Sequence, residues 1–214
     1  MGSSITTLLV LVGLLFLNLV AAQNDTSFVF SSFDCMKDSH LKCSGDSSTS
    51  GQGPLNLTAV TTGSVGHALY TPGIRFLDPA TSKTSSFSTN FTFSIQRVNS
   101  GSQAAGEGLA FVILSNPNFT GSGGGFLGVY GSDGRAGAPT LAVEFDTFKD
   151  VKTGNFTFND INNNHVGLDL DSINSKAQVD AAPAGVILYK ASSVTAWVEY
   201  SAPTDVQHPV RFVP

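Results

Sequence analysis

Residues 141–172 read LAVEFDTFKDVKTGNFTFNDINNNHVGLDLDS, and this stretch decides both the fold and the chemistry that we expect. The alternating pattern at its start places Glu144 and Asp146 on one face of a strand, because successive side chains of a strand point to opposite faces. A polar loop follows, and it carries four more oxygen-bearing side chains: Asp150, Asn155, Asn159 and Asp160. His165 then opens a second apolar strand. Hard oxygen ligands combined with one imidazole predict two bound cations, one calcium-like and one a transition metal.

The rest of the chain also reads as short strands separated by turns. Alternating or continuous apolar runs predict strands at Ser27–Phe30, Leu55–Val60, Ser86–Ile95, Leu109–Leu114, Thr140–Glu144, His165–Leu170, Gly185–Tyr189 and Thr195–Tyr200. Glycine- and proline-rich turns separate these runs, and no window has the apolar period of a helix. The 16 phenylalanines and the single tryptophan, Trp197, fit a core between two sheets. The sequence therefore predicts an all-β sandwich in one domain, of jelly-roll type.

The N-terminal segment predicts a secreted protein. Ile5–Ala22 is almost wholly apolar, ends in small residues and is short for a membrane span, so we expect residues 1–22 to be a signal peptide and residues 23–214 the domain. We predict no other membrane span. Secretion would make five Asn-x-Thr sequons glycosylation sites: Asn24, Asn56, Asn90, Asn118 and Asn155. In an oxidising compartment we expect Cys35 and Cys43 to pair.

Charge and composition narrow the classes of partner. The net charge is −5 and only 13% of the residues are charged, which argues against binding to nucleic acid or to an anionic membrane surface. Two cysteines are too few for a disulfide scaffold. Asp169 and Asp171 extend the strand after His165, and we expect both to be solvated rather than catalytic.

Six short motifs follow one another between Ser27 and Tyr200. They are Phe87–Ile95 (FSTNFTFSI), Gly106–Phe111 (GEGLAF), Gly124–Tyr130 (GGFLGVY), Leu141–Phe148 (LAVEFDTF), Asn164–Ile173 (NHVGLDLDSI) and Thr195–Tyr200 (TAWVEY). In this order they resemble the plant legume-lectin (L-type lectin) family, and most of all the extracellular lectin domains of lectin receptor kinases. The resemblance implies a legume-lectin-like jelly roll that binds glycans or glycoproteins outside the cell and is not an enzyme.

The resemblance also implies a manganese site beside a calcium site. Carried over by position, the Mn²⁺ ligands would be Glu144, Asp146, Asp160 and His165. The Ca²⁺ ligands would be Asp146, the backbone carbonyl of Phe148, Asp150 and Asp160. Asp146 and Asp160 would then bridge the two ions. The donor types agree with this division, since imidazole with carboxylates suits manganese and carboxylates with a carbonyl suit calcium.

The family's monosaccharide site lies on this platform, and the resemblance places it at four residues: Glu107, Gly125, Phe148 and Asp150. Glu107 would accept hydrogen bonds from sugar hydroxyls after a cis peptide bond held by the calcium loop. Gly125 would donate its backbone N–H, and Phe148 would support the apolar face of the sugar. This chain has Glu107 where the family has Asp, and Asp150 where the family has Asn. An ionised Asp150 cannot donate to a hydroxyl, so weak or altered sugar specificity is expected.

The family's domain continues past Tyr200 through further strands and a loop that tunes sugar specificity. This chain ends at Pro214, so we expect a lectin domain that lacks its C-terminal strands, either as a fragment or as a short form. Missing strands would expose sheet edges. The sequence names no particular sugar and leaves open whether the chain forms a dimer through a sheet edge.

Two other functions compete with sugar binding. A non-carbohydrate extracellular module that binds a peptide or a hydrophobic ligand would agree with the altered Glu107 and Asp150. A jelly-roll glycoside hydrolase would use Glu144 and Asp146, which alternate positions place roughly 6.5–7 Å apart along the backbone. Such enzymes have a third acid where Lys149 or its neighbour Phe148 stands here, so hydrolysis is the weaker alternative.

Overall fold

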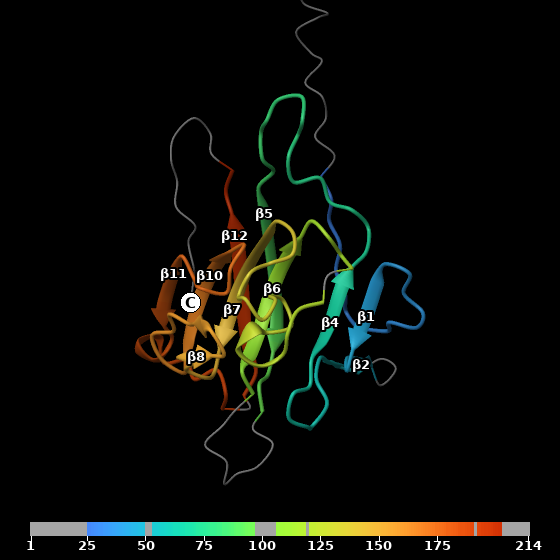
Figure 1. Ribbon diagram of the computed structural model, residues 1–214. Helices are drawn as coiled ribbons and strands as arrows, with labels where there is room; N and C mark the ends of the chain where they lie inside the picture. Colours follow the sequence, from blue (N-terminus) through green and yellow to red (C-terminus); the bar gives the residue numbers. More distant parts are fainter. Residues whose placement is uncertain (1–24, 50–52, 97–105, 119, 191, 203–214) are drawn as a thin grey trace, which may run out of the picture. The chain divides into compact units, whose positions relative to one another are not determined.

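The structure is a computed structural model that describes residues 25–49, 53–96, 106–118, 120–190 and 192–202 (Figure 1). Residues 25–31 belong to one compact unit and the other described residues to a second. The first unit has no regular element over residues 25–31, so the strand predicted at Ser27–Phe30 is wrong. Alternation alone does not make a strand, because a strand needs a neighbour to bond its backbone groups.

The second unit is built from antiparallel strands. Its strands are β1 (Leu41–Gly45), β2 (Ser48–Thr49), β3 (Leu55–Asn56), β4 (Gly66–Tyr70), β5 (Phe87–Phe93), β6 (Gly108–Leu114), β7 (Thr140–Asp146), β8 (Lys152–Thr153), β9 (Phe156–Thr157), β10 (His165–Leu170), β11 (Ala177–Asp180) and β12 (Val194–Tyr200). Two short 3₁₀ turns complete the described elements, η1 (Gly124–Phe126) and η2 (Ala182–Ala184). The largest sheet has the order β11-β10-β7-β6, while β12 pairs with β5 and β1 with β4. The short pairs β2-β3 and β8-β9 are hairpin-like.

One face of the four-stranded sheet packs on the β5-β12 pair, which lies behind it in Figure 1. Alternation along β7 directs Val143 and Phe145 to this side, where Ala196 and Val198 of β12 meet them. Phenylalanine rings fill the layer, and the ring centroids of Phe93 and Phe145 are 4.9 Å apart. Each large apolar side chain buried here stabilises the fold by about 1.5–3 kcal/mol, so this layer is the main core.

The opposite face of the same sheet is covered by loops. A second apolar cluster lies there and consists of Phe126, Val129, Tyr130, Ala142, Phe158 and Ile173. The cluster joins the sheet to η1 and to the loop that contains β8 and β9. Because Glu144 and Asp146 alternate with Val143 and Phe145, both carboxylates lie on this loop-covered face. The fold therefore buries acidic residues between a sheet and a loop layer.

The predicted all-β sandwich is confirmed, and most predicted strands occur within a residue or two of their expected ends. The strand predicted at Gly185–Tyr189 is wrong, because this segment turns after η2 with Gly185 at a φ of 77°. Its backbone is bonded instead by the Asn164 side chain, which donates to the Val186 carbonyl at 2.9 Å and accepts from the Leu188 N–H at 2.9 Å.

Trp197 was expected in the core, and this prediction is also wrong. Ala196 and Val198 take the two buried positions of β12, so Trp197 between them points outward and is 45% exposed. Its apolar neighbours in the sequence gave a misleading signal, because in a strand the immediate neighbours lie on the other face.

Candidate functional site

The register of β7 with β10 brings the predicted metal residues to one face. Asp146 pairs with His165 and Glu144 pairs with Gly167, so both carboxylates and the imidazole lie side by side. A Cβ on Gly167 would lie 2.2 Å from Glu144 Oε1 and 2.4 Å from Ser175 Oγ. Glycine at this position therefore leaves the space that the Glu144 carboxylate occupies.

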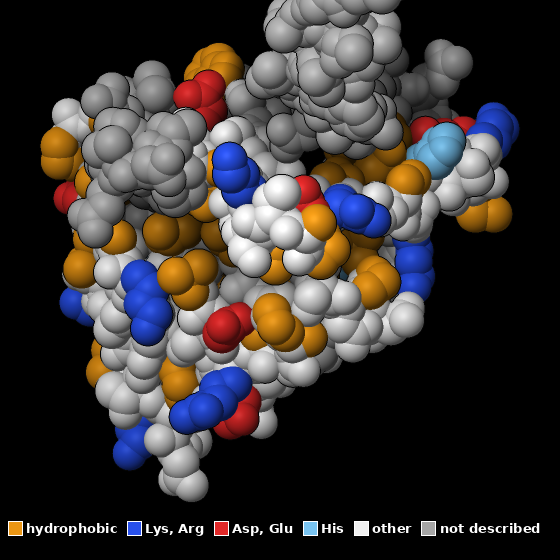
Figure 2. All heavy atoms as spheres, turned by 90° about the horizontal axis from the view of Figure 1, so that it is seen from above, with side chains coloured by type: hydrophobic (Ala, Val, Ile, Leu, Met, Phe, Trp, Pro, Cys, Tyr) orange, Lys and Arg blue, Asp and Glu red, His pale blue; other side chains and the backbone are white. Residues whose placement is uncertain are grey.

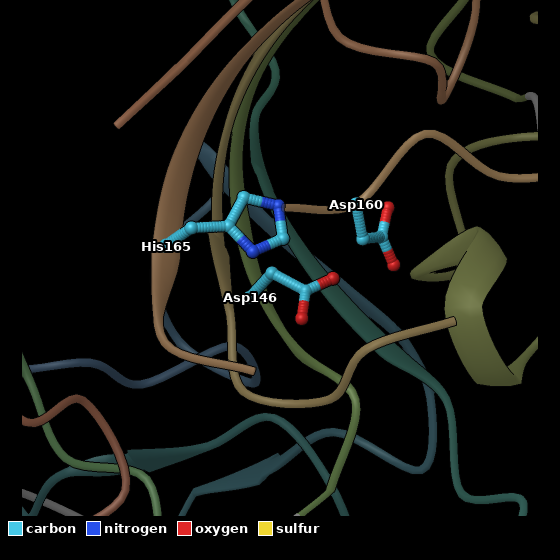
Figure 3. Close-up of side chains that lie close together, drawn as sticks. All are labelled: Asp146, Asp160 and His165. Carbon is cyan, nitrogen blue, oxygen red and sulfur yellow. The ribbon is translucent and has the colours of Figure 1, made fainter. Parts of the chain in front are cut away.

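Asp160 completes a compact triad with Asp146 and His165 (Figure 3). One ligand atom from each residue lies within 4.8 Å of the other two, as expected for groups that share one ion. Asp160 comes from the loop between β9 and β10, whereas the other two residues come from paired strands. The other two predicted carboxylate ligands, Glu144 and Asp150, lie next to this triad but are not members of it.

The imidazole of His165 is oriented for ligation. Its Nδ1 lies 2.8 Å from the Asn162 carbonyl oxygen, which can only accept, so Nδ1 carries the hydrogen. Nε2 then points into the site, 3.4 Å from Glu144 Oε1, and it is buried without a hydrogen-bond partner. Burial lowers the pKa of His165, but the neighbouring Glu144 carboxylate more than offsets this and the pKa is raised overall. An orphaned imidazole nitrogen among carboxylates is the arrangement of a metal ligand.

Among the described residues, the carboxylates of the site have the His165 imidazole beside them but no Lys or Arg. Burial, followed by the neighbouring acids, raises the pKa of Asp146 to about 9, although a hydrogen bond from the Phe148 N–H opposes this. Burial likewise raises the pKa of Asp160 to about 6. Within the described ranges, no Lys or Arg forms an ion pair with either group. A bound divalent cation would offset the repulsion between these carboxylates and so lower their pKa values.

The loop after β7 is tied to the site by its own backbone. The Phe148 N–H donates to Asp146 Oδ1 at 2.7 Å, and the Asp150 N–H donates to Asp160 Oδ2 at 2.7 Å. The loop therefore depends on the two carboxylates that were predicted to bridge the ions. Any change in the charge or position of Asp146 or Asp160 would be transmitted to Phe148 and Asp150.

A buried polar network behind the site was missed by sequence reasoning. Ser175 Oγ lies 2.5 Å from Glu144 Oε1 and 2.8 Å from Asp169 Oδ1, and Tyr130 donates to Asp169 Oδ2 at 3.2 Å. The prediction that Asp169 is solvated is wrong, since it is fully buried. A hydroxyl has one hydrogen and cannot donate to both acids, so one carboxyl must hold a proton. Burial and the Glu144 charge raise the pKa of Asp169 to about 8, which favours its protonated form near neutral pH.

The burial of Asp169 could have been predicted from the alternation of residues along β10. Asp169 follows His165 by four residues, and therefore shares its face of the strand. Ser175 and Tyr130 could not be found in this way, because they reach the network from a loop and from the segment after η1.

Three of the four predicted sugar-site residues, Glu107, Gly125 and Asp150, lie together. The Glu107 and Asp150 carboxyl groups are within hydrogen-bonding reach of each other, and one buried oxygen of each has no partner unless the two share a proton. Burial and the Asp150 charge raise the pKa of Glu107 to about 7. A Cβ on Gly125 would lie 2.0 Å from Asp150 Oδ2, so the Gly125 backbone borders the same group. The Phe148 ring, two residues before Asp150 in the sequence, is 38% exposed.

The cis peptide bond expected before Glu107 is wrong, because none of the described peptide bonds is cis. Thr147 bonds both residues at this position: its N–H donates to the Glu107 carbonyl at 3.0 Å and its hydroxyl donates to the Gly106 carbonyl. These two hydrogen bonds satisfy the carbonyl oxygens of Gly106 and Glu107 with a trans peptide bond between them.

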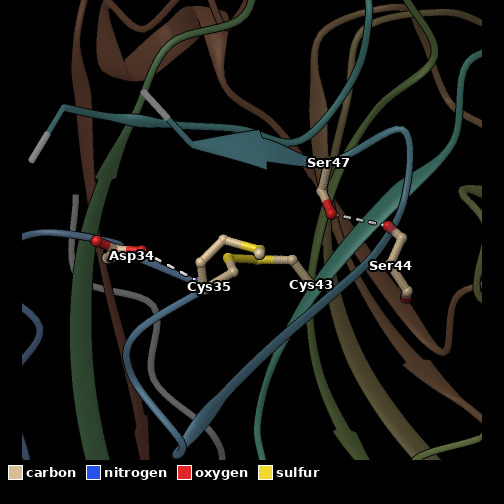
Figure 4. Close-up of a disulfide and its surroundings, with 6 residues drawn as sticks. Asp34, Cys35, Cys43, Ser44 and Ser47 are labelled. Carbon is tan, nitrogen blue, oxygen red and sulfur yellow. Dashed lines mark hydrogen bonds between the residues drawn. A yellow bond between two sulfur atoms is a disulfide. The ribbon is translucent and has the colours of Figure 1, made fainter. Parts of the chain in front are cut away.

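The remaining predicted sites are the disulfide cysteines and the sequon asparagines. Cys35 and Cys43 are bonded to each other with their Cα atoms 5.7 Å apart, and the disulfide closes the turn before β1 (Figure 4). The described sequon asparagines are all exposed: Asn56, Asn90, Asn118 and Asn155. Asn24 and the predicted signal peptide lie outside the described residues, so their assignment stays a prediction.

Comparison with known proteins identifies the family. The legume lectin domain matches residues 25–208. The Arabidopsis thaliana protein named probable L-type lectin-domain containing receptor kinase S.7 is 36% identical over 188 residues, which are 84% of this chain and 26% of that protein. A protein named lectin from Leucomphalos mildbraedii is 40% identical over 164 residues, covering 72% of this chain and 64% of its own length. The structure of basic winged bean lectin with Tn-antigen has a TM-score of 0.66 at 29% identity, covering 82% of this chain and 70% of that chain.

These relatives are lectins and lectin-domain receptor kinases, which supports the jelly-roll architecture and gives no support to an enzyme in this domain. The chain spans about a quarter of the receptor kinases that it matches, 26% of one and 22% of another. No helix among the described residues is long and apolar enough to span a bilayer. The buried position of Glu144, bonded to Ser175, also leaves it unavailable as a hydrolytic acid.

Proposed function

The chain belongs to the legume lectin family, and on this premise we propose that it is a carbohydrate-binding domain whose binding face is organised by Ca²⁺ and Mn²⁺. The single observation that supports the metals most strongly is the orphaned Nε2 of His165, buried beside Asp146 and Asp160 without a hydrogen-bond partner. A folded chain without ions would have to hold these groups protonated or leave them repelling one another.

The donor set fits both ions. We assign Glu144, Asp146, Asp160 and His165 to Mn²⁺, which accepts imidazole and carboxylate ligands. We assign Asp146, the Phe148 carbonyl, Asp150 and Asp160 to Ca²⁺, which prefers oxygen ligands. Bound ions would neutralise the carboxylates, and the N–H groups of Phe148 and Asp150 would then fix the loop against ionised Asp146 and Asp160. Metal binding would in this way be coupled to the shape of the sugar platform.

The sugar site itself is altered, and its geometry supports weak or changed specificity. Glu107 is directed towards Asp150, so the acceptor expected for sugar hydroxyls is engaged with a neighbouring acid. Asp150 supplies no amide hydrogen to a sugar. A site that misplaces one acceptor and lacks one donor forfeits about 1–3 kcal/mol at each position. We therefore propose that the chain binds glycans. Its affinity for monosaccharides would be lower than that of a site with Asp at position 107 and Asn at position 150.

An extracellular setting is part of the same proposal. The apolar N-terminus, the exposed sequons and the Cys35–Cys43 disulfide are all consistent with the secretory pathway. The relatives include lectin-domain receptor kinases, and glycans or glycoproteins are the partners that this function requires.

One observation favours a second function. The loop of the site exposes three apolar side chains, Phe148 at 38%, Val151 at 64% and Ile161 at 45%. Exposed apolar side chains of this kind fit a peptide or an apolar small molecule as well as a sugar. Figure 2, a view from above, also shows exposed hydrophobic side chains interspersed with separate Lys, Arg and acidic groups. The second candidate is therefore an extracellular module that binds a non-carbohydrate ligand.

Glycan-array binding before and after EDTA treatment separates the two functions. Binding to defined glycans that EDTA abolishes and Ca²⁺ with Mn²⁺ restores would support the lectin. Two histidine variants form a matched pair. His165→Ala removes the buried nitrogen of the site. His40→Ala removes an imidazole that lies 3.4 Å from Asp38 and has no contact with the site residues. We expect His165→Ala alone to abolish binding. Absence of glycan binding, with peptide binding indifferent to EDTA, would contradict the lectin proposal.

A further inference from the structure

The outer face of the β5-β12 pair is a polar strip that contains one aromatic residue. Phe87, Phe91 and Phe93 point towards the core, so the alternate residues of β5 point outward, and β12 behaves in the same way. The outward residues are Ser88, Asn90, Thr92, Thr195, Trp197 and Glu199. The antiparallel register places Trp197 directly opposite Asn90. The core does not account for an indole that is 45% exposed in these polar surroundings.

In each of the two neighbouring cross-strand pairs, the two side chains are hydrogen-bonded to each other. The hydroxyls of Thr92 and Thr195 lie 2.9 Å apart, and Ser88 Oγ donates to Glu199 Oε1 at 3.4 Å. The central pair is different, because no hydrogen bond to another described residue involves the side chain of Asn90 or Trp197. An amide and an indole are thus presented side by side with their polar groups available.

Asn90 is also the first residue of an Asn-Phe-Thr sequon. In the secretory pathway the Asn90 Nδ2 would attack the anomeric carbon of a lipid-diphosphate-linked oligosaccharide. The new C–N bond replaces the C–O bond to the diphosphate, the amide loses one hydrogen as a proton, and the lipid diphosphate leaves. This transfer precedes folding, so the later bond between Thr92 and Thr195 does not oppose it.

We propose that Asn90 carries an N-linked glycan whose first N-acetylglucosamine lies on the face of Trp197. Directly opposite residues of an antiparallel pair have Cβ atoms about 4.5–5.5 Å apart, so a ring attached to the Asn90 amide reaches the neighbouring indole. The indole face carries negative potential, and the C–H groups of a pyranose face carry partial positive charge. The hydroxyls and the acetamide group of the sugar stay in contact with water.

The glycan would explain the exposed indole, and it would also affect assembly. It covers the exposed indole, which otherwise contacts water on a monomer surface. It also occupies the centre of the strip, so a second copy of the chain cannot pack there. This inference depends on secretion but not on the metal or sugar site.

The experiment uses the full chain produced in a eukaryotic secretion host. Glycopeptide mass spectrometry measures occupancy at each sequon, and an endoglycosidase that leaves one N-acetylglucosamine isolates the contact of that sugar. Trp197 is the only tryptophan, so its fluorescence reports on this position alone. We expect Asn90 to be occupied, and acrylamide quenching of Trp197 to be about two-fold weaker with one sugar than in Asn90→Gln, because one indole face is covered.

Two controls separate the glycan from other causes. Asn56→Gln removes a sequon on an exposed strand residue that pairs with Ser48 rather than an aromatic residue, and should leave quenching unchanged. Thr92→Ser keeps the sequon while Thr92→Val removes it, so only the latter should match Asn90→Gln. An unmodified Asn90 would overturn the proposal, as would equal quenching with and without the sugar. Protection of Trp197 that depends on protein concentration would assign the face to a second copy instead.

Discussion

Removing the metals should make the stability of this protein fall as the pH rises. In the metal-free chain the folded pKa values are raised to about 6 for Asp160, about 7 for Glu107 and about 9 for Asp146, from ordinary values of 3.8, 4.5 and 3.8. A carboxyl with a raised pKa binds a proton on folding. Its contribution is complete below the unfolded pKa and is lost as the pH rises through the folded pKa.

The magnitude follows from these values over the interval from pH 5 to pH 8. Between these limits Asp160 loses about one pH unit of linkage, Glu107 about two and Asp146 about three, at about 1.4 kcal/mol per unit. Asp169, whose pKa is raised to about 8, loses about three more. The sum for independent groups is about 12 kcal/mol. The shifts are not additive, because each carboxyl raises the pKa of its neighbours, and solvent screens the partly exposed Asp160 and Glu107, so about 3 kcal/mol remains. We expect the free energy of unfolding in EDTA to fall by about 3 kcal/mol across this interval.

Urea unfolding at pH 5 and pH 8, in EDTA and in excess Ca²⁺ with Mn²⁺, measures this directly. With the ions present the trend should reverse, because a cation binds the ionised carboxylates and is displaced by protons at low pH. Stability in EDTA that stays constant or increases from pH 5 to pH 8 would refute the reasoning. The disulfide must stay oxidised throughout so that only the ionisation changes.

Three substitutions test other parts of the account. Ser175→Ala removes the hydroxyl between Glu144 and Asp169, and should lower the free energy of unfolding by about 2–4 kcal/mol in chemical denaturation. Gly125→Ala places a methyl group 2.0 Å from Asp150 Oδ2, and calorimetry should show Ca²⁺ affinity reduced about tenfold or more, while the open site at Gly73 tolerates alanine. Glu107→Asp shortens the acid that faces Asp150, and monosaccharide affinity should rise about tenfold, equivalent to one recovered hydrogen bond.

Each of the three has an outcome that would contradict it. Ser175→Ala with unchanged stability would mean that the two buried acids need no bridging hydroxyl. Equal Ca²⁺ affinity in Gly125→Ala and Gly73→Ala would show that a side chain at position 125 does not disturb the calcium ligands. If Glu107→Asp bound sugar no better than the unaltered chain, the length of this side chain would not be what limits the site.

The strands of the sandwich were predictable where apolar residues alternate with polar ones. His165–Leu170 and the segment from Thr140 show this pattern, and the structure confirms both. Gly185–Tyr189 was not predictable in this way, because its backbone is satisfied by the distant side chain of Asn164 rather than by a strand. Trp197 shows the same limit, since apolar character does not reveal which face of a strand a residue takes.

The metal cluster was predictable because its members lie on two paired strands and one short loop. Asp146 and His165 meet directly in the register, and Asp160 arrives with the loop between them. The roles of Ser175 and Tyr130 could not be predicted from the local sequence, because their contacts with Glu144 and Asp169 arise from tertiary packing. The engagement of Glu107 with Asp150 was equally invisible, although the types of both residues signalled an altered sugar site.

Titration of the metal-stripped protein with Mn²⁺ and then Ca²⁺, followed by calorimetry and elemental analysis, tests the central claim most directly. The account predicts one equivalent of each ion per chain, with Mn²⁺ binding lost in His165→Ala and retained in His40→Ala. Binding of neither ion, or equal binding by both variants, would contradict it.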